Sequence, residues 1–198
     1  MTIHCHPGRI RERVMSESKK LAVIIPGIGY TKDKPILYYS SKLLKESGYE
    51  ILDVFFSGMP ENIIKDDSLK LLAVKLAYEQ ITAQLSDVKF SEYEDVVFVG
   101  KSLGTIAAAK YVSDNGIKAK QIWYTPLEKT FSYDPGNVLA FIGDADPWSD
   151  INAIRSEAAR CGVSLVEYEA CNHSLESGDI LKDIVTLEDS LRKVWDFI

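Results

Sequence analysis

The chain has 198 residues, 46% of them hydrophobic, so it is long enough to bury the core of one domain. Its formal net charge is -6 at pH 7, which argues against the basic surface that binds nucleic acids or acidic lipids. No apolar run approaches the roughly 18 residues that span a bilayer. We therefore expect a small-molecule ligand, no nucleic-acid partner and no membrane partner.

The amino end is predicted to be a flexible tail, residues 1–18, followed by a single domain at residues 19–198. The tail mixes charged residues with few apolar ones and has no signal-peptide pattern, so we expect a cytoplasmic protein. His4, Cys5 and His6 are the nearest approach to a metal-ligand cluster. No second ligand pair follows at the spacing of a zinc site, so no metal is expected.

Six short apolar runs alternate with longer segments of helical periodicity through the rest of the chain. Runs that are apolar at nearly every position are typical of strands buried on both faces. Their alternation with helices predicts an α/β fold, with a doubly wound, mostly parallel sheet of about six strands and helices on both faces. The predicted strands are residues 21–25, 50–55, 95–99, 119–124, 138–142 and 163–168.

Three of the intervening segments are predicted to be long helices. Residues 34–47 form the first, with Asp33 as a candidate cap and Pro35 in the first turn. Residues 67–86 and 179–198 each carry an apolar stripe at helical spacing, which indicates a face packed on the sheet. The stripes are Val74, Tyr78, Ile81 and Leu85 in one helix, and Ile180, Ile184, Leu187, Leu191 and Val194 in the other.

The sharpest local motif is Gly100-Lys101-Ser102-Leu103-Gly104, between the predicted strand at 95–99 and a helical segment at 105–113. A serine at such a turn is held in a strained conformation, and the two glycines remove Cβ atoms that would collide as strand and helix approach. The hydroxyl then lies at the carboxyl edge of the sheet, at the positive end of the helix. The same residues resemble the end of a phosphate-binding loop, but Asp95 stands where that loop requires glycine.

A serine hydroxyl needs a base, and His173 is the only histidine outside the tail. It follows the last predicted strand, on the edge of the sheet where Ser102 is expected. A third residue should be a carboxylate that fixes the tautomer of the imidazole. Asp146, in the loop after the fifth strand, is the preferred acid, and Asp144 and Glu128 are alternatives.

With these motifs the chain resembles the α/β-hydrolase fold family, in which nucleophile, acid and histidine follow one another in the order of Ser102, Asp146 and His173. The resemblance is closest to small bacterial members without a lid, and it implies no cofactor. It also implies an oxyanion hole formed by the backbone amides of Leu103 and Ile28. In the loop that contains Ile28, Pro26 stands where many members of the family have histidine. An ordinary turn at Ile28 is therefore an alternative. The two antiparallel strands with which the family's sheet usually begins have no counterpart, so a trimmed sheet is expected.

Three neighbouring features complete the predicted site. Lys101 is interpreted as a surface lysine that covers the helix start, with attraction of an anionic substrate group as the alternative. Cys171 is interpreted as a packing residue, and the odd count of three cysteines indicates free thiols. The connection at 125–137 has room for little more than a turn of helix, which predicts an open, shallow site without a lid or interfacial activation.

The resemblance implies a carboxylesterase-like serine hydrolase that acts on a small ester through an acyl-enzyme intermediate. Thioester and amide substrates, or transfer of the acyl group to an acceptor other than water, are alternatives on the same three residues. A further alternative is a binding or scaffold protein that retains the fold without turnover.

Overall fold

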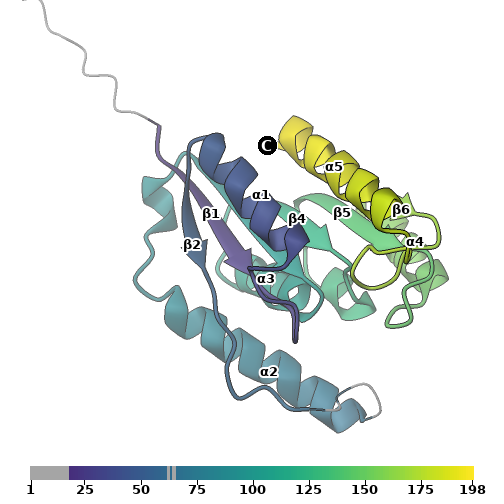
Figure 1. The fold of residues 1–198 in the computed structure, drawn as a ribbon. Helices are drawn as coiled ribbons and strands as arrows, with labels where there is room; N and C mark the ends of the chain where they lie inside the picture. The colour runs from purple at the N-terminus through teal and green to yellow at the C-terminus, as the bar shows by residue number, and fades with distance from the viewer. Residues whose placement is uncertain (1–17, 62, 64–65) are drawn as a thin grey trace, which may run out of the picture.

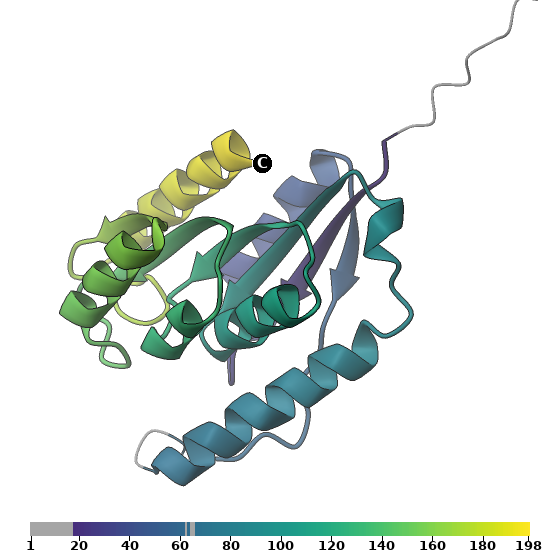
Figure 2. The same ribbon diagram turned by 180° about the vertical axis from the view of Figure 1, so that it is seen from behind.

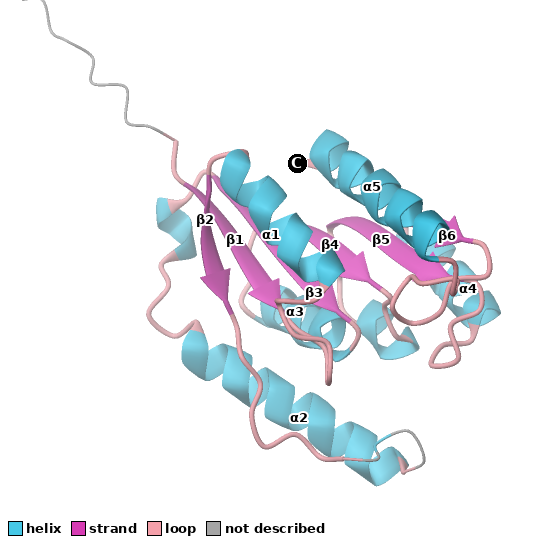
Figure 3. Cartoon of the chain, in the orientation of Figure 1, coloured by secondary structure: helices cyan, strands magenta, loops and turns pink. Residues whose placement is uncertain are grey.

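The computed structural model describes residues 18–61, 63 and 66–198, and the predicted tail lies outside these residues except for its last position (Figure 1). The strands of its sheet are β1 (Lys20–Ile25), β2 (Tyr49–Asp53), β3 (Asp95–Lys101), β4 (Lys120–Tyr124), β5 (Asn137–Gly143) and β6 (Ser164–Tyr168). They lie in the order β2-β1-β3-β4-β5-β6, and each neighbouring pair is parallel. All six predicted strands are confirmed, and their arrows point the same way in Figure 3.

Helices cover both faces of the sheet, as predicted. They are α1 (Pro35–Glu46), α2 (Asp67–Gln84), α3 (Leu103–Asp114), α4 (Ile151–Cys161) and α5 (Ile180–Phe197), with 3-10 turns η2 (Phe90–Glu92) and η3 (Glu128–Ser132). Helices α1 and α5 lie on the face seen in Figure 1, and α2, α3 and α4 lie on the face seen in Figure 2. No helix in the described part of the chain is long and apolar enough to cross a membrane.

Two details of the helices differ from the predictions. Asp33 does not cap α1; since Pro35 occupies the first helical position, Lys34 becomes the N-cap, and its side chain makes no capping bond. Helix α4 was not predicted, although Asp150 caps it by accepting hydrogen bonds from the N–H groups of Asn152 and Ala153. That capping aspartate is the signal that would have located the start of α4.

The apolar stripe of α5 packs on the core through Leu187 and Val194 but not through its first turns. Val194 is fully buried and Leu187 packs against the same core, whereas Ile180 and Ile184 are 70% and 55% exposed. The packing-face prediction is therefore wrong for the first turns of α5. These turns lie near the edge strand β6, beyond which the described residues contain no further element to cover them.

The strand order reverses at β1, which lies between β2 and β3. Connections on either side of such a reversal leave the sheet in opposite directions and open a crevice at its carboxyl edge. Four of the strands end at this edge with a residue of the predicted site shortly after them. Ile28 follows β1, Ser102 follows β3, Asp146 follows β5 and His173 follows β6.

Candidate active site

Ser102 occupies a strained turn between β3 and α3. Its φ of 54° and ψ of -120° lie in a region that non-glycine residues rarely adopt. The turn is held by its backbone: the Ser102 N–H donates to the carbonyl of Tyr124 at 2.9 Å. The Ser102 carbonyl accepts from both the N–H and the hydroxyl of Thr105, at 2.8 and 2.7 Å. These bonds fix the hydroxyl at the carboxyl edge of the sheet.

At both glycines of the motif, the backbone of a neighbouring segment comes too close to leave room for a side chain. A Cβ on Gly100 would lie 2.8 Å from the carbonyl oxygen of Gly104. A Cβ on Gly104 would lie 2.5 Å from the carbonyl oxygen of Pro26, in the loop after β1. Both positions therefore require glycine, for the steric reason inferred from the sequence.

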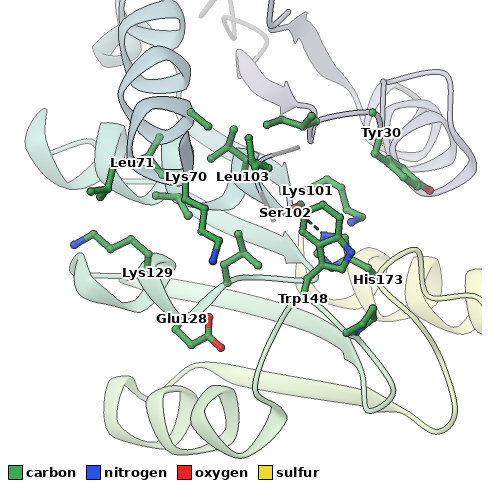
Figure 4. A pocket seen from close by; sticks show the side chains of 18 of the residues that line it. Tyr30, Lys70, Leu71, Lys101, Ser102, Leu103, Glu128, Lys129, Trp148 and His173 are labelled. Carbon is green, nitrogen blue, oxygen red and sulfur yellow. Dashed lines mark hydrogen bonds between the residues drawn. The ribbon is translucent and has the colours of Figure 1, made fainter. Parts of the chain in front are cut away.

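Three side chains from distant parts of the chain meet at this edge. His173 Nε2 lies 2.8 Å from Ser102 Oγ, the contact drawn in Figure 4. On the other side of the ring, His173 Nδ1 lies 2.7 Å from Asp146 Oδ2. A carboxylate only accepts hydrogen bonds, so Nδ1 carries the proton of the neutral ring. Nε2 is thereby left with a free lone pair that faces the Ser102 hydroxyl.

Of the three candidate carboxylates, the structure places only Asp146 against the imidazole. Its side chain is 1% exposed, and its other oxygen accepts from the N–H of Trp148 at 2.9 Å. Asp144 instead accepts from the N–H of Ala170, and Glu128 accepts from the N–H of Asp150. Each of these two carboxylates thus bonds the backbone of a loop or helix start and not the imidazole.

The environment of His173 favours its neutral form. Burial lowers the pKa of the imidazole below its ordinary value, and the nearby positive charge of Lys101 lowers it further. The hydrogen bond and the charge of Asp146 oppose this shift. A neutral imidazole is the form that can accept a proton.

Trp148 is a component of the site that the sequence analysis did not assign. Its indole stacks on the imidazole of His173, with ring centres 5.1 Å apart and planes 15° apart, and Figure 4 shows the two rings together. Asp146 holds the edge of the imidazole at Nδ1, and the stacked indole of Trp148 packs against its face. No sequence pattern signals this stacking, because Trp148 and His173 lie in loops that follow different strands.

The loop that carries His173 is ordered by its neighbour Asn172. The Asn172 side-chain oxygen accepts from the N–H groups of Ser174 and Glu176, at 2.7 and 3.2 Å. The backbone of Asn172 is bonded in the same loop, to the N–H of Leu175 and the carbonyl of Glu176. Asparagine favours such turns because its side chain bonds the backbone a few residues on.

The two residues predicted to supply the oxyanion hole, Leu103 and Ile28, both belong to the lining of the cavity that contains Ser102. Leu103 is the first residue of α3, so its N–H has no partner within the helix. Ile28 lies in a tight turn in which Gly27 and Tyr30 bond each other's backbone. Among the described residues neither amide has a backbone acceptor, and Leu103 and Ile28 both line the cavity at Ser102.

A cavity of about 620 Å³ opens on Ser102 and His173, a volume typical of small-molecule sites. Most of the side chains that line it are apolar. They include Ile28, Leu71, Val74, Leu103, Ile106 and Leu127. Helix α2 contributes one wall, which the sequence analysis did not anticipate, whereas the connection between β4 and β5 contains only η3, as its length predicted.

The prediction that Lys101 is a surface residue is wrong. The side chain is fully buried, because the Tyr30 ring and Thr125 pack against it from the loops after β1 and β4. Cys171 is buried as predicted, and burial raises the pKa of its thiol, which keeps it protonated. In the part of the chain that the structure describes, no group of three or more His, Cys, Asp or Glu side chains could hold a metal ion.

No protein-family model matches the sequence, and a search of curated proteins finds no significant match. Solved structures are similar over nearly the whole chain. An α/β serine hydrolase homologue from Coxiella burnetii is 18% identical with a TM-score of 0.66, and the alignment covers 92% of this chain and 88% of that one. The esterase Pf2001 from Pyrococcus furiosus is 13% identical with a TM-score of 0.65, covering 91% and 82%.

The chain therefore has the α/β-hydrolase fold, in a trimmed form with six parallel strands. Its structural neighbours include a serine hydrolase without a lid from Xanthomonas campestris, 15% identical with a TM-score of 0.59, covering 92% of this chain and 85% of that one. The predicted fold class is confirmed, as is the resemblance to small hydrolases of this fold.

Proposed function

We propose that this protein is a serine hydrolase that cleaves a small carboxylic ester or a related acyl substrate through an acyl-enzyme. One observation carries the proposal: Ser102 Oγ lies 2.8 Å from His173 Nε2, with Asp146 bonded to the opposite nitrogen. A nucleophile within hydrogen-bond reach of a base, which is itself oriented by a third group, is the arrangement that activates a serine. The hydrolases and esterases among the structural neighbours support it at the level of the fold.

Acylation begins when Ser102 Oγ adds to the substrate carbonyl carbon while its proton passes to His173 Nε2. The carbonyl oxygen becomes an oxyanion that the amides of Leu103 and Ile28 stabilise, each donor contributing about 3 to 4 kcal/mol. Asp146 stabilises the imidazolium through Nδ1. The carbon–oxygen bond to the alcohol then breaks, and the alcohol leaves with the proton from Nε2.

Deacylation repeats these steps with water. His173 takes a proton from the water as its oxygen adds to the acyl carbon, and the same amides hold the second oxyanion. The bond to Ser102 Oγ breaks, the serine recovers its proton from Nε2, and the carboxylic acid is released. No step requires a group outside the chain's own residues and water.

A fluorophosphonate probe tests the nucleophile directly, because it reacts covalently with activated serines. We expect it to label the wild-type protein and not Ser102→Ala. Ser91→Ala is a matched control, since Ser91 is exposed in η2 and outside the cavity, and it should be labelled like the wild type. Label retained in Ser102→Ala would assign the reactive group elsewhere; no label and no turnover of p-nitrophenyl acetate by the folded wild type would favour a scaffold protein.

The apolar cavity predicts a preference for longer acyl chains. Each methylene that enters it contributes about 0.8 kcal/mol, so kcat/KM for p-nitrophenyl esters should rise about fourfold per methylene until the cavity is filled. Leu71 of α2 lines the cavity although it is 70% exposed, so Leu71→Asp should not disturb the fold. This change should lower kcat/KM for the octanoate ester about tenfold and leave that for the acetate nearly unchanged.

Leu72→Asp is the control for that experiment. Leu72 is the next residue of α2 and is partly exposed, but it does not line the cavity. It should leave the chain-length profile as in the wild type. Equal losses in both variants, or a flat profile in the wild type, would mean that the acyl chain binds elsewhere.

A further inference from the structure

The residue before the proposed nucleophile carries a charged group that the mechanism above does not use. Lys101 is fully buried, and its ammonium lies 2.6 Å from Thr125 Oγ1 and 5.0 Å from the centre of the Tyr30 ring. An ammonium has three N–H donors, and Thr125 is its one hydrogen-bond partner among the described residues. Burial of a charge with so few partners is costly, and buried lysines lose their proton readily.

The neighbours of Lys101 hold its side chain in place. Thr125 has a φ of 47°, and its N–H donates to the carbonyl of Phe141 at 2.7 Å, so its hydroxyl lies on a constrained backbone. The Tyr30 hydroxyl accepts from the N–H of Ile36 at 3.2 Å, which fixes the ring over the amine. The side chain of Lys101 is therefore fixed in the wall of the cavity that Ser102 and His173 also line.

The titratable groups around Lys101 come from the end of β4 and from the loops after β1, β5 and β6. Two of these groups interact with the charge of Lys101. The negative charge of Asp146 raises the pKa of Lys101, and the positive charge of Lys101 lowers the pKa of His173. The tyrosines remain neutral, since burial raises the pKa of Tyr30 to about 12 and raises that of the tyrosine at the end of β4. The full set is Tyr30, Tyr124, Asp146, His173 and, through its effect on Tyr30, Glu176.

We propose that Lys101 is a positioning residue for the base: its buried amine sets the pH range over which the His173 imidazole is neutral and able to accept a proton from Ser102. A positive charge disfavours a second one nearby, so the ammonium keeps the imidazole unprotonated to lower pH. It also makes the imidazolium a stronger acid toward the leaving alcohol. Burial lowers the pKa of Lys101 to about 7, so this influence fades above that pH.

The catalytic consequence rests on the proposed function, but the electrostatic coupling exists whether or not the protein cleaves an ester. Lys101→Met removes the charge and keeps the length of the side chain, and loss of a buried charge should not destabilise the fold. We expect the midpoint of the His173 ring titration, followed by NMR, to rise by about one pH unit. The acidic limb of kcat/KM should rise with it. The His173 signal is assigned by its absence from His173→Gln.

Lys110→Met is the matched control, because Lys110 lies on α3 and pairs with Asp114 at the surface. It should leave the His173 midpoint unchanged. Should Lys101→Met fail to fold, Thr125→Val removes only the hydrogen bond to the amine and should raise the midpoint by less, in the same direction. An unchanged midpoint in the folded variant overturns the proposal. A shifted midpoint in a protein without turnover supports it and refutes the proposed function instead.

Discussion

Replacing Asp146 by asparagine is expected to lower kcat by about 10⁴-fold while leaving the fold intact. The N–H of Trp148 donates to Asp146 Oδ1, so an asparagine would keep its oxygen on that side. Its NH₂ group would then face His173 Nδ1, which must accept the bond. The ring proton would move to Nε2, the nitrogen that faces Ser102, and the imidazole could no longer act as a base.

The measurement is kcat for a p-nitrophenyl ester, with the urea unfolding midpoint measured beside it. Asp144→Asn is the control, because Asp144 lies two residues away in the same loop. Among the described residues its side chain bonds only the backbone N–H of Ala170. It should keep kcat within about threefold of the wild type, since surface changes away from a site have small effects. An Asp146→Asn protein with a tenth or more of the wild-type kcat would exclude the assigned orientation of the histidine.

Gly143→Ala is expected to cost about 3 kcal/mol or more in free energy of unfolding and to abolish activity. A Cβ at the end of β5 would lie 2.0 Å from the carbonyl oxygen of Cys171 and 2.9 Å from that of Asn172. These are backbone atoms, and the Cys171 carbonyl is held by the N–H of Ala145. Relief of the clash must displace the loop that carries His173, so stability and activity should fall together.

Gly136→Ala tests the same strand from its other end. Gly136 precedes β5 and has a φ of +62°, but nothing lies within 4 Å of its Cβ position. Alanine there should cost only about 1 to 2 kcal/mol, the backbone penalty of a left-handed conformation, and should leave activity unchanged. The measurement is the midpoint of urea unfolding for Gly143→Ala and Gly136→Ala. Similar midpoints in the two variants would mean that the close contact at Gly143 does not constrain the fold.

The fold was predictable because its signals are local. The strands β1, β3 and β5 are mostly apolar and buried along nearly their whole length, and the glycines around Ser102 report a steric requirement of the turn itself. The convergence of Ser102, Asp146 and His173 was predictable because each follows a strand, and the parallel strands of the sheet end at one edge.

The features that escaped prediction depend on contacts between distant segments. Lys101 is buried because Tyr30 and Thr125, which follow two other strands, close over it, and nothing beside Lys101 in the sequence reports them. The wall formed by α2 depends in the same way on where a helix lies over the sheet. The stacking of Trp148 on His173 joins residues from different loops, and no periodicity encodes it.

The separation of 71 residues between Ser102 and His173 has a consequence during synthesis on the ribosome. When the turn that carries Ser102 emerges, β4, β5 and β6 have still to be synthesised, and His173 follows only after the last of them. A growing polypeptide thus carries an alcohol without its proton acceptor. Under the proposed function, activation of the Ser102 hydroxyl is therefore delayed until the sheet is complete, since such long-range contacts form late in folding.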